Sequence, residues 1–336
     1  MVRVLVGKEQ REFEMHRKLL CTTSTFFRDN LDNLEAKIAS QSPTSSEQET
    51  DEDPVLWLPS ESPEVFELFV HWLYDRRPFY SLVDEAIQNV TPRNGSSSSP
   101  RSASPKSRQH ESSRRTLRWN LVRLHLFAEL INLPALQDAS MDALQDMYLR
   151  CDWDMSPGFI AFLYGDCDQE HALRLRKWAV AMLAWTLHGG EMEPSIASQF
   201  ERLFATFPKL TDDYCVHLEK MAASKADVRI KNPQLRLPMN KLRSEERFFG
   251  FRQCSFHSHR STVGEGICPH LLAHCPSAAG GMSISSSSSS SPRAAAQGGG
   301  GAAAAVAAAE LNDGSDTEQP IITPLCDMET SFLDLS

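Results

Sequence analysis

The sequence lacks a hydrophobic run long enough to cross a membrane. Its strongest apolar stretch, from Trp178 to Leu187, is about half of the roughly 20 residues that a membrane-spanning helix needs, so we interpret it as a buried helix. No secretory leader follows Met1. We therefore expect an intracellular protein, in the nucleus or the cytoplasm, that has no membrane partner.

The chain also lacks the basic excess that nucleic-acid-binding proteins usually carry. Its formal net charge is −10 over 336 residues, which argues against nucleic acid as a partner. Eight cysteines are scattered along the chain. Without a secretory leader, we expect them to be reduced thiols and not a disulfide framework.

Common catalytic motifs are missing too. The sequence has no Gly-x-x-x-x-Gly-Lys-Ser/Thr phosphate loop, no Gly-x-Gly-x-x-Gly after a strand, no Gly-x-Ser-x-Gly elbow and no His-Glu-x-x-His. Asp152 and Asp154 flank Trp153, but no residue pairs with them as acid and base. Because a catalytic site needs a convergent nucleophile, base and stabiliser, we expect that the protein is not an enzyme.

The start of the chain contains apolar residues at alternate positions. Val2 and Val4 occupy alternate positions in one short run, and Phe13 and Met15 do so in the next. This is the period of strands with one face turned inward. The polar segment 7–10 between the runs has the length of a hairpin connection. The sequence therefore predicts a two-stranded hairpin.

After these two runs, apolar residues at helical spacing occur in two segments. Leu19 and Leu20 share one side of a helix expected after His16. A second helix is expected after a short strand at 55–58, with Ser62 as N-cap and Pro63 at its first position. Its apolar residues repeat at intervals of three and four, namely Val65, Phe66, Phe69, Val70 and Leu73.

These segments resemble the BTB/POZ family. Residues 2–27 are similar to the family's hairpin, with a strand ending in Met-His, followed by Leu-Leu-x-x-x-Ser-x-x-Phe. Residues 58–74 match Leu-Pro-x-x-x-Pro-x-x-Phe-x-x-Phe-x-x-Trp-Leu-Tyr. A helical hairpin up to about residue 150 would close the domain. The resemblance covers residues 1–150, apart from two inserts at about 40–53 and 91–115 that we expect to be disordered.

The resemblance implies an α+β fold, in which a small sheet packs under helical hairpins, and a protein-binding function. The partner would be a second copy of the chain or another protein, and a substrate adaptor for a cullin-type ubiquitin ligase is the use that the family suggests. Carried over by position, the dimer or partner interface would consist of Val2, Val4, Leu19, Leu20 and Phe27.

The rest of the chain divides by composition. Residues 155–223 show helical spacing and are expected to form an all-helical region. Residues 224–276 are expected to be irregular. Residues 277–336 are dominated by Gly, Ala and Ser, which predicts a disordered low-complexity tail.

The irregular segment is rich in cysteine and histidine. Cys254, His257, Cys268 and His270 could supply the four ligands of a tetrahedral zinc ion. The spacing matches no common zinc-finger pattern, so the alternative is a segment without metal and a protein without a cofactor. If zinc is bound, the alternative function is a nuclear regulator associated with transcription or chromatin.

Overall fold

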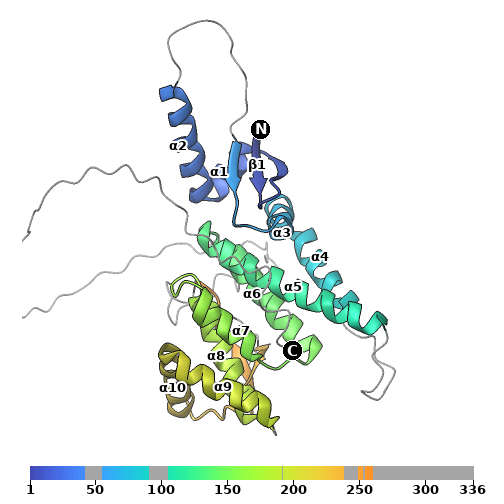
Figure 1. Cartoon of the computed structure of the whole chain (residues 1–336), viewed down its shortest axis with the longest axis vertical. Coiled ribbons are helices and arrows are strands. Elements are labelled where there is room, and N and C mark those ends of the chain that lie inside the picture. Colours follow the sequence, from blue (N-terminus) through green and yellow to red (C-terminus); the bar gives the residue numbers. More distant parts are fainter. Residues whose placement is uncertain (42–54, 91–104, 191, 238–248, 253, 260–336) are drawn as a thin grey trace, which may run out of the picture. The chain divides into compact units, whose positions relative to one another are not determined.

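The computed structural model describes residues 1–41, 55–90, 105–190, 192–237, 249–252 and 254–259. All of them belong to one compact unit that includes Met1–Cys268. Figure 1 shows the helices and strands of this part of the chain. Of the insert expected at 40–53, residues 42–53 lie outside the described residues. Of the insert expected at 91–115, residues 91–104 lie outside them. The expected tail, 277–336, lies outside them completely.

A three-stranded sheet forms the start of the fold. Strands β1 (Val2–Val6) and β2 (Arg11–Met15) make the predicted antiparallel hairpin. Strand β3 (Val55–Leu58) pairs with β1 in parallel, so the order is β2-β1-β3. Gly7 in the hairpin has φ +79°, a conformation that glycine adopts without steric cost. The alternate residues of β1 are buried, as the sequence pattern predicts.

Helices pack on the inner face of this sheet. Helices α1 (Arg17–Thr23) and α2 (Thr25–Gln41) follow β2, and α3 (Pro63–Tyr74) follows β3. Ser62 caps α3 by accepting a hydrogen bond from the Val65 amide at 3.5 Å, as expected for a serine before a first-turn proline. Phe69 of α3 stacks on Phe27 at 5.6 Å between ring centroids and meets Phe127 edge to face.

Three further helices complete the first half. Helix α4 (Arg76–Val90) packs on α3, and the long helix α5 (Pro105–Leu130) forms a hairpin with α6 (Pro134–Cys151). The start of α5 corrects the sequence prediction, because residues 105–115 were expected to belong to a disordered insert. A polar stretch can continue a helix whose later turns are held by packing, and every residue from Leu121 to Phe127 except Arg123 is buried here.

The second half is mostly helical. Helix α7 (Pro157–Ala161) continues into a π-helical turn, η1 (Phe162–Asp166), and is followed by α8 (Leu173–His188), α9 (Pro194–Thr206) and α10 (Pro208–Ala223). Helix α8 is buried along most of its length, with Trp178 at its centre. The helical region predicted at 155–223 is therefore present in the structure.

The segment expected to be irregular contains two strands. Strand β4 (Asn232–Leu237) pairs in parallel with β5 (Gly250–Arg252), and β4 packs against α6 and α8. The prediction was wrong here because a pair of short strands gives little periodicity, and the helices against which β4 packs are far away in the sequence. The predicted α+β class is confirmed, with helix as the main component. Within the described residues, no helix is both long and apolar enough to span a bilayer.

Candidate functional site

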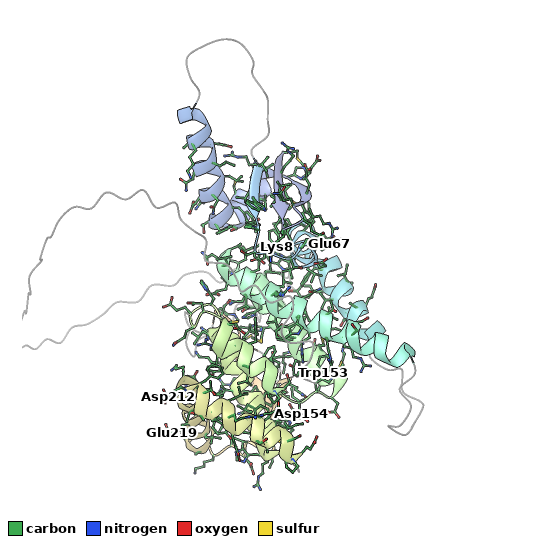
Figure 2. The ribbon with its side chains drawn as sticks, viewed as in Figure 1. Lys8, Glu67, Trp153, Asp154, Asp212 and Glu219 are labelled. Atoms are coloured by element: carbon green, nitrogen blue, oxygen red, sulfur yellow. The ribbon has the colours of Figure 1, made fainter. Side chains whose placement is uncertain are left out.

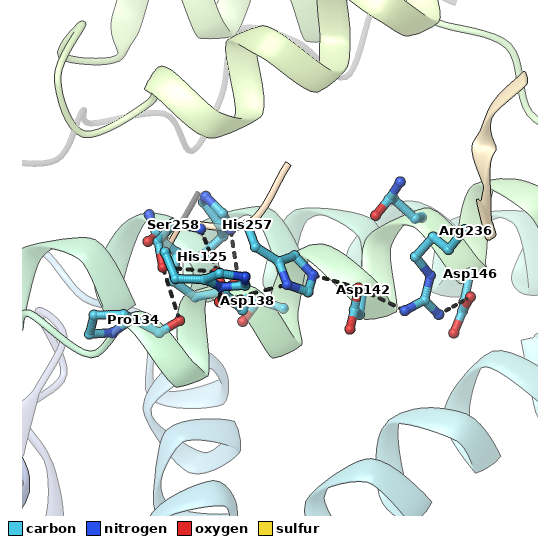
Figure 3. Close-up of polar contacts among 12 residues, drawn as sticks. His125, Pro134, Asp138, Asp142, Asp146, Arg236, His257 and Ser258 are labelled. Carbon is cyan, nitrogen blue, oxygen red and sulfur yellow. Dashed lines mark hydrogen bonds and ion pairs between the residues drawn. The ribbon is translucent and has the colours of Figure 1, made fainter. Parts of the chain in front are cut away.

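One face of helix α6 carries three aspartates. Asp138, Asp142 and Asp146 are spaced four residues apart and therefore lie on the same side of the helix (Figure 3). Asp138 is only 3% exposed. A carboxylate buried this deeply needs partners, because an ionised group without them is costly in the interior. All three find them in residues that follow more than 80 positions later in the chain.

Strand β4 supplies the first of these partners. Arg236 forms an ion pair with Asp142 through Nη1 at 2.7 Å and a second one with Asp146 through Nη2. Burial opposes the positive charge of Arg236, but the two carboxylates raise the pKa of its guanidinium above the ordinary value. The arginine thus neutralises one end of the acidic face and holds β4 against α6.

Residues 254–259 supply the other partners. The backbone N–H and the hydroxyl of Ser258 donate to Oδ1 of Asp138 at 2.6 and 2.9 Å. Nδ1 of His259 lies 2.8 Å from Oδ2 of Asp138, and Nε2 of His257 lies 2.8 Å from Oδ1 of Asp142. Each imidazole is therefore oriented by a carboxylate of α6.

A third histidine lies next to this cluster in α5. His125 is buried, and its Nδ1 is 3.0 Å from the carbonyl oxygen of Gln137. Burial lowers the pKa of His125 to about 4, so its ring is neutral at pH 7. Because a carbonyl only accepts, Nδ1 carries the proton and donates it to Gln137. His125 thus links α5 to the first turn of α6.

Within the described residues, one group of side chains has the composition and spacing of a metal site. The ligand atoms of Cys254, His257 and His259 all lie within 4.8 Å of one another. Cys254 and His257 were predicted as ligands, whereas Cys268 and His270 lie outside the described residues. The ligand set predicted from the sequence did not include His259. Its place in the run Cys-x-x-His-x-His was the only sign in the sequence.

The residues predicted for a dimer or partner interface lie mostly in the core. The side chains of Val2, Val4, Leu20 and Phe27 are fully buried within the single chain, and only Leu19 is partly exposed. Buried side chains cannot contact another protein without opening the fold. The structure therefore gives four of these five residues a packing role, because strand alternation and helical spacing mark core and interface positions alike.

The outer face of the sheet exposes apolar side chains. Trp57 in β3 is 50% exposed and stands opposite Leu5 in β1, and Val55 stands opposite Arg3. Glu12 and Glu14 of β2 complete the same two rows. We call Leu5, Val55 and Trp57 the outer sheet patch. No sequence pattern marks this patch, because the run 55–58 is apolar throughout and does not show which residues face outward.

A cavity of about 490 Å³ lies in the second half, between the start of α7 and the connection from α8 to α9. Asp154, which lies beside Trp153 in the connection between α6 and α7 (Figure 2), is in its lining together with Trp185, Met192 and Glu193. Burial raises the pKa of Asp154, and so does the charge of Asp152. A hydrogen bond with the side chain of Thr186, another lining residue, acts on this pKa in the opposite direction.

Comparisons with protein-family models, with curated proteins and with solved structures found no match to this chain.

Proposed function

We propose that the protein is a protein-binding module and that the outer sheet patch of its N-terminal region docks onto another polypeptide. The observation that carries the proposal is the exposure of Trp57 on the outer face of the sheet, next to Leu5 and Val55. The BTB/POZ-like sequence pattern of residues 1–150 supports the same conclusion from a separate direction. In that family, the domain assembles protein complexes.

The energy available at this patch is sufficient for an interface anchor. A tryptophan side chain presents about 250 Å², and half of that area, at about 25 cal/mol per Å², corresponds to about 3 kcal/mol if a partner covers it. Tryptophan is also among the residues enriched at the energetic centres of protein interfaces. The indole N–H donates to the carbonyl of Gly7 at 3.4 Å, which holds the ring across the sheet.

The charge beside the patch indicates the chemistry of the partner. Glu12 and Glu14 are exposed on the β2 side of the same face, and Arg3 is paired with Glu12 at 3.8 Å. A complementary partner would place an apolar side chain over Trp57 and lysine or arginine groups over the two glutamates. The net charge of −10 favours a different, more basic protein over a second copy of this chain. A cullin scaffold as that protein is suggested by the family resemblance alone.

Affinity purification of the full chain tests this proposal. Trp57→Glu is compared with Tyr80→Glu, a matched change at an aromatic residue of α4 that is 52% exposed. The partner recovered with the wild type is then purified and its direct binding to each variant is measured. We expect Trp57→Glu to weaken binding at least tenfold and Tyr80→Glu to leave it unchanged. Equal binding by all three proteins would contradict the proposal, and a dimer of the chain that Trp57→Glu disrupts would identify a second copy as the occupant.

A second function, a regulator associated with transcription or chromatin, draws its support from a different observation, the convergence of Cys254, His257 and His259. It requires both a bound metal and binding to DNA. A DNA probe that shifts with the wild type and no longer shifts with Cys254→Ser would favour this function. A probe that stays unshifted at physiological salt would leave the protein-binding function in place.

A further inference from the structure

Three side chains from one short segment converge at the acidic face of α6. Cys254 and His257 are each 2% exposed, and the side chain of His259 is 12% exposed. Their ligand atoms are within 4.8 Å of one another. In a tetrahedral zinc site, with bonds of about 2.0 Å to nitrogen and 2.3 Å to sulfur, the ligand atoms are about 3.3–3.6 Å apart. Side-chain rotations that draw the atoms in by about 1 Å would close such a site.

The hydrogen bonds of the two histidines assign the protonated nitrogen of each ring. A carboxylate only accepts, so Nε2 of His257 donates to Asp142 and Nδ1 of His259 donates to Asp138. In the neutral rings, Nδ1 of His257 and Nε2 of His259 then carry lone pairs. Pairing of the second ring nitrogen with a carboxylate is the arrangement that orients metal-bound histidines and strengthens them as ligands.

The charges around the cluster suit a divalent cation. Asp138 lies close to both rings, with Oδ2 also 3.7 Å from Nδ1 of His257. Arg236 pairs with Asp142 and Asp146, and Arg174 donates to the carbonyl of Ser258 at 3.3 Å. Arg236 thus balances the far end of the acidic face. A divalent cation would balance the near end, where Asp138 and a deprotonated Cys254 would place two negative charges.

We propose that Cys254, His257 and His259 bind a zinc ion. One thiolate and two imidazoles form a borderline-soft ligand set, which suits zinc and not the oxygen-seeking Mg²⁺ or Ca²⁺. The fourth position of the tetrahedron takes water or one further ligand. By holding the two imidazoles in the tautomers that donate to Asp138 and Asp142, the ion fastens residues 254–259 to α6. This site is independent of the outer sheet patch.

Metal analysis of the full chain, purified without a polyhistidine tag from zinc-containing medium, tests the site. We expect about one zinc per chain in the wild type and less than a tenth of that in Cys254→Ser. The matched control is Cys215→Ser, which changes an exposed cysteine of α10 and should keep the zinc. A wild-type protein that contains no zinc and takes up none when zinc is added would overturn the proposal, as would full zinc content in Cys254→Ser.

Cobalt substitution gives a readout that loss of folding alone cannot imitate. Co²⁺ bound to a thiolate has a charge-transfer absorption band, which should appear in the wild type and in Cys215→Ser. In His259→Gln, the band should require more Co²⁺, whereas Cys254→Ser should lose it while its circular dichroism stays like that of the wild type. Asp142→Asn removes the carboxylate that orients His257, together with its ion pair to Arg236, and we expect it to weaken zinc binding 10- to 100-fold. Unchanged affinity in both His259→Gln and Asp142→Asn would contradict the proposed ligand set.

Discussion

The carboxyl group of Glu61 makes the stability of the fold dependent on pH. Glu61 lies between β3 and α3, is 8% exposed, and its Oε1 has no hydrogen-bond partner in the described part of the chain. Burial raises the pKa of Glu61 from 4.5 to about 7, although the charge of Arg123 acts in the opposite direction. The folded protein therefore keeps this proton at pH values where the unfolded chain has already released it.

The sign and size of the effect follow from this difference. Between pH 4.5 and 7 the unfolded state binds fewer protons than the folded state, so the free energy of unfolding falls as the pH rises. Below pH 4.5 and above pH 7 the contribution of Glu61 is constant. At about 1.36 kcal/mol per pH unit, the interval between the two pKa values corresponds to about 3 kcal/mol of stability lost by pH 8.

Replacing Glu61 by glutamine keeps the shape and removes the charge. We expect Glu61→Gln to be as stable as the wild type at pH 4 and about 3 kcal/mol more stable at pH 8. Urea unfolding of both proteins, followed by circular dichroism at intervals from pH 4 to 8, measures this difference.

Glu64→Gln serves as the control for sign. Glu64 is exposed, and the hydrogen bond from the Ser62 side chain lowers its pKa. The stability that this carboxylate contributes is present above pH 4.5 and is lost as the pH falls. Glu64→Gln should therefore lose stability at pH 8, the opposite of Glu61→Gln. Unfolding free energies of wild type and Glu61→Gln that run parallel from pH 4 to 8 would refute the reasoning about Glu61.

Three further changes test the packing and the ion pairs. Phe69→Ala removes a fully buried ring and should lower the free energy of unfolding, measured by chemical denaturation, by about 3–5 kcal/mol. A loss below about 1 kcal/mol would contradict the place of Phe69 in the core. Arg236→Met leaves Asp142 and Asp146 without their cation, and we expect the free energy of unfolding to fall by about 3 kcal/mol. The fall should be smaller in the triple variant, in which both aspartates are also changed to asparagine. Asp152 has φ +51° at the end of α6, so Asp152→Gly should raise stability by up to about 1 kcal/mol in thermal melts; a lower melting temperature would argue against that backbone conformation.

Local patterns predicted the parts of the fold that local interactions specify. The alternation of Val2 and Val4 marked β1, and the pair Ser62-Pro63 marked the start of α3, because strand faces and helix caps depend on neighbouring residues. The same patterns do not distinguish a dimer surface from a core. The family resemblance implies an interface role for Leu20 and Phe27, and the structure buries both side chains within the single chain.

The acidic face of α6 shows what a single segment of sequence cannot reveal. Asp138, Asp142 and Asp146 at four-residue spacing are typical of a solvent-exposed helix surface. Asp138 is buried only because residues 254–259 return to cover it, and Asp142 and Asp146 are partly covered by Arg236 of β4. Pairings across 90 to 121 positions leave no periodic signal in either segment. Cysteine and histidine content was the one visible sign that this later segment had a specific role.

The contact between His259 and Asp138 joins positions 121 residues apart. During translation, α6 is made long before the residues that neutralise its carboxylates have left the ribosome, so this domain is completed late in synthesis. A premature stop codon between codons 146 and 254 would therefore leave the acidic face of α6 without the segment that covers and pairs with it, and such a shortened chain should be less stable than the full one and be removed by cellular quality control.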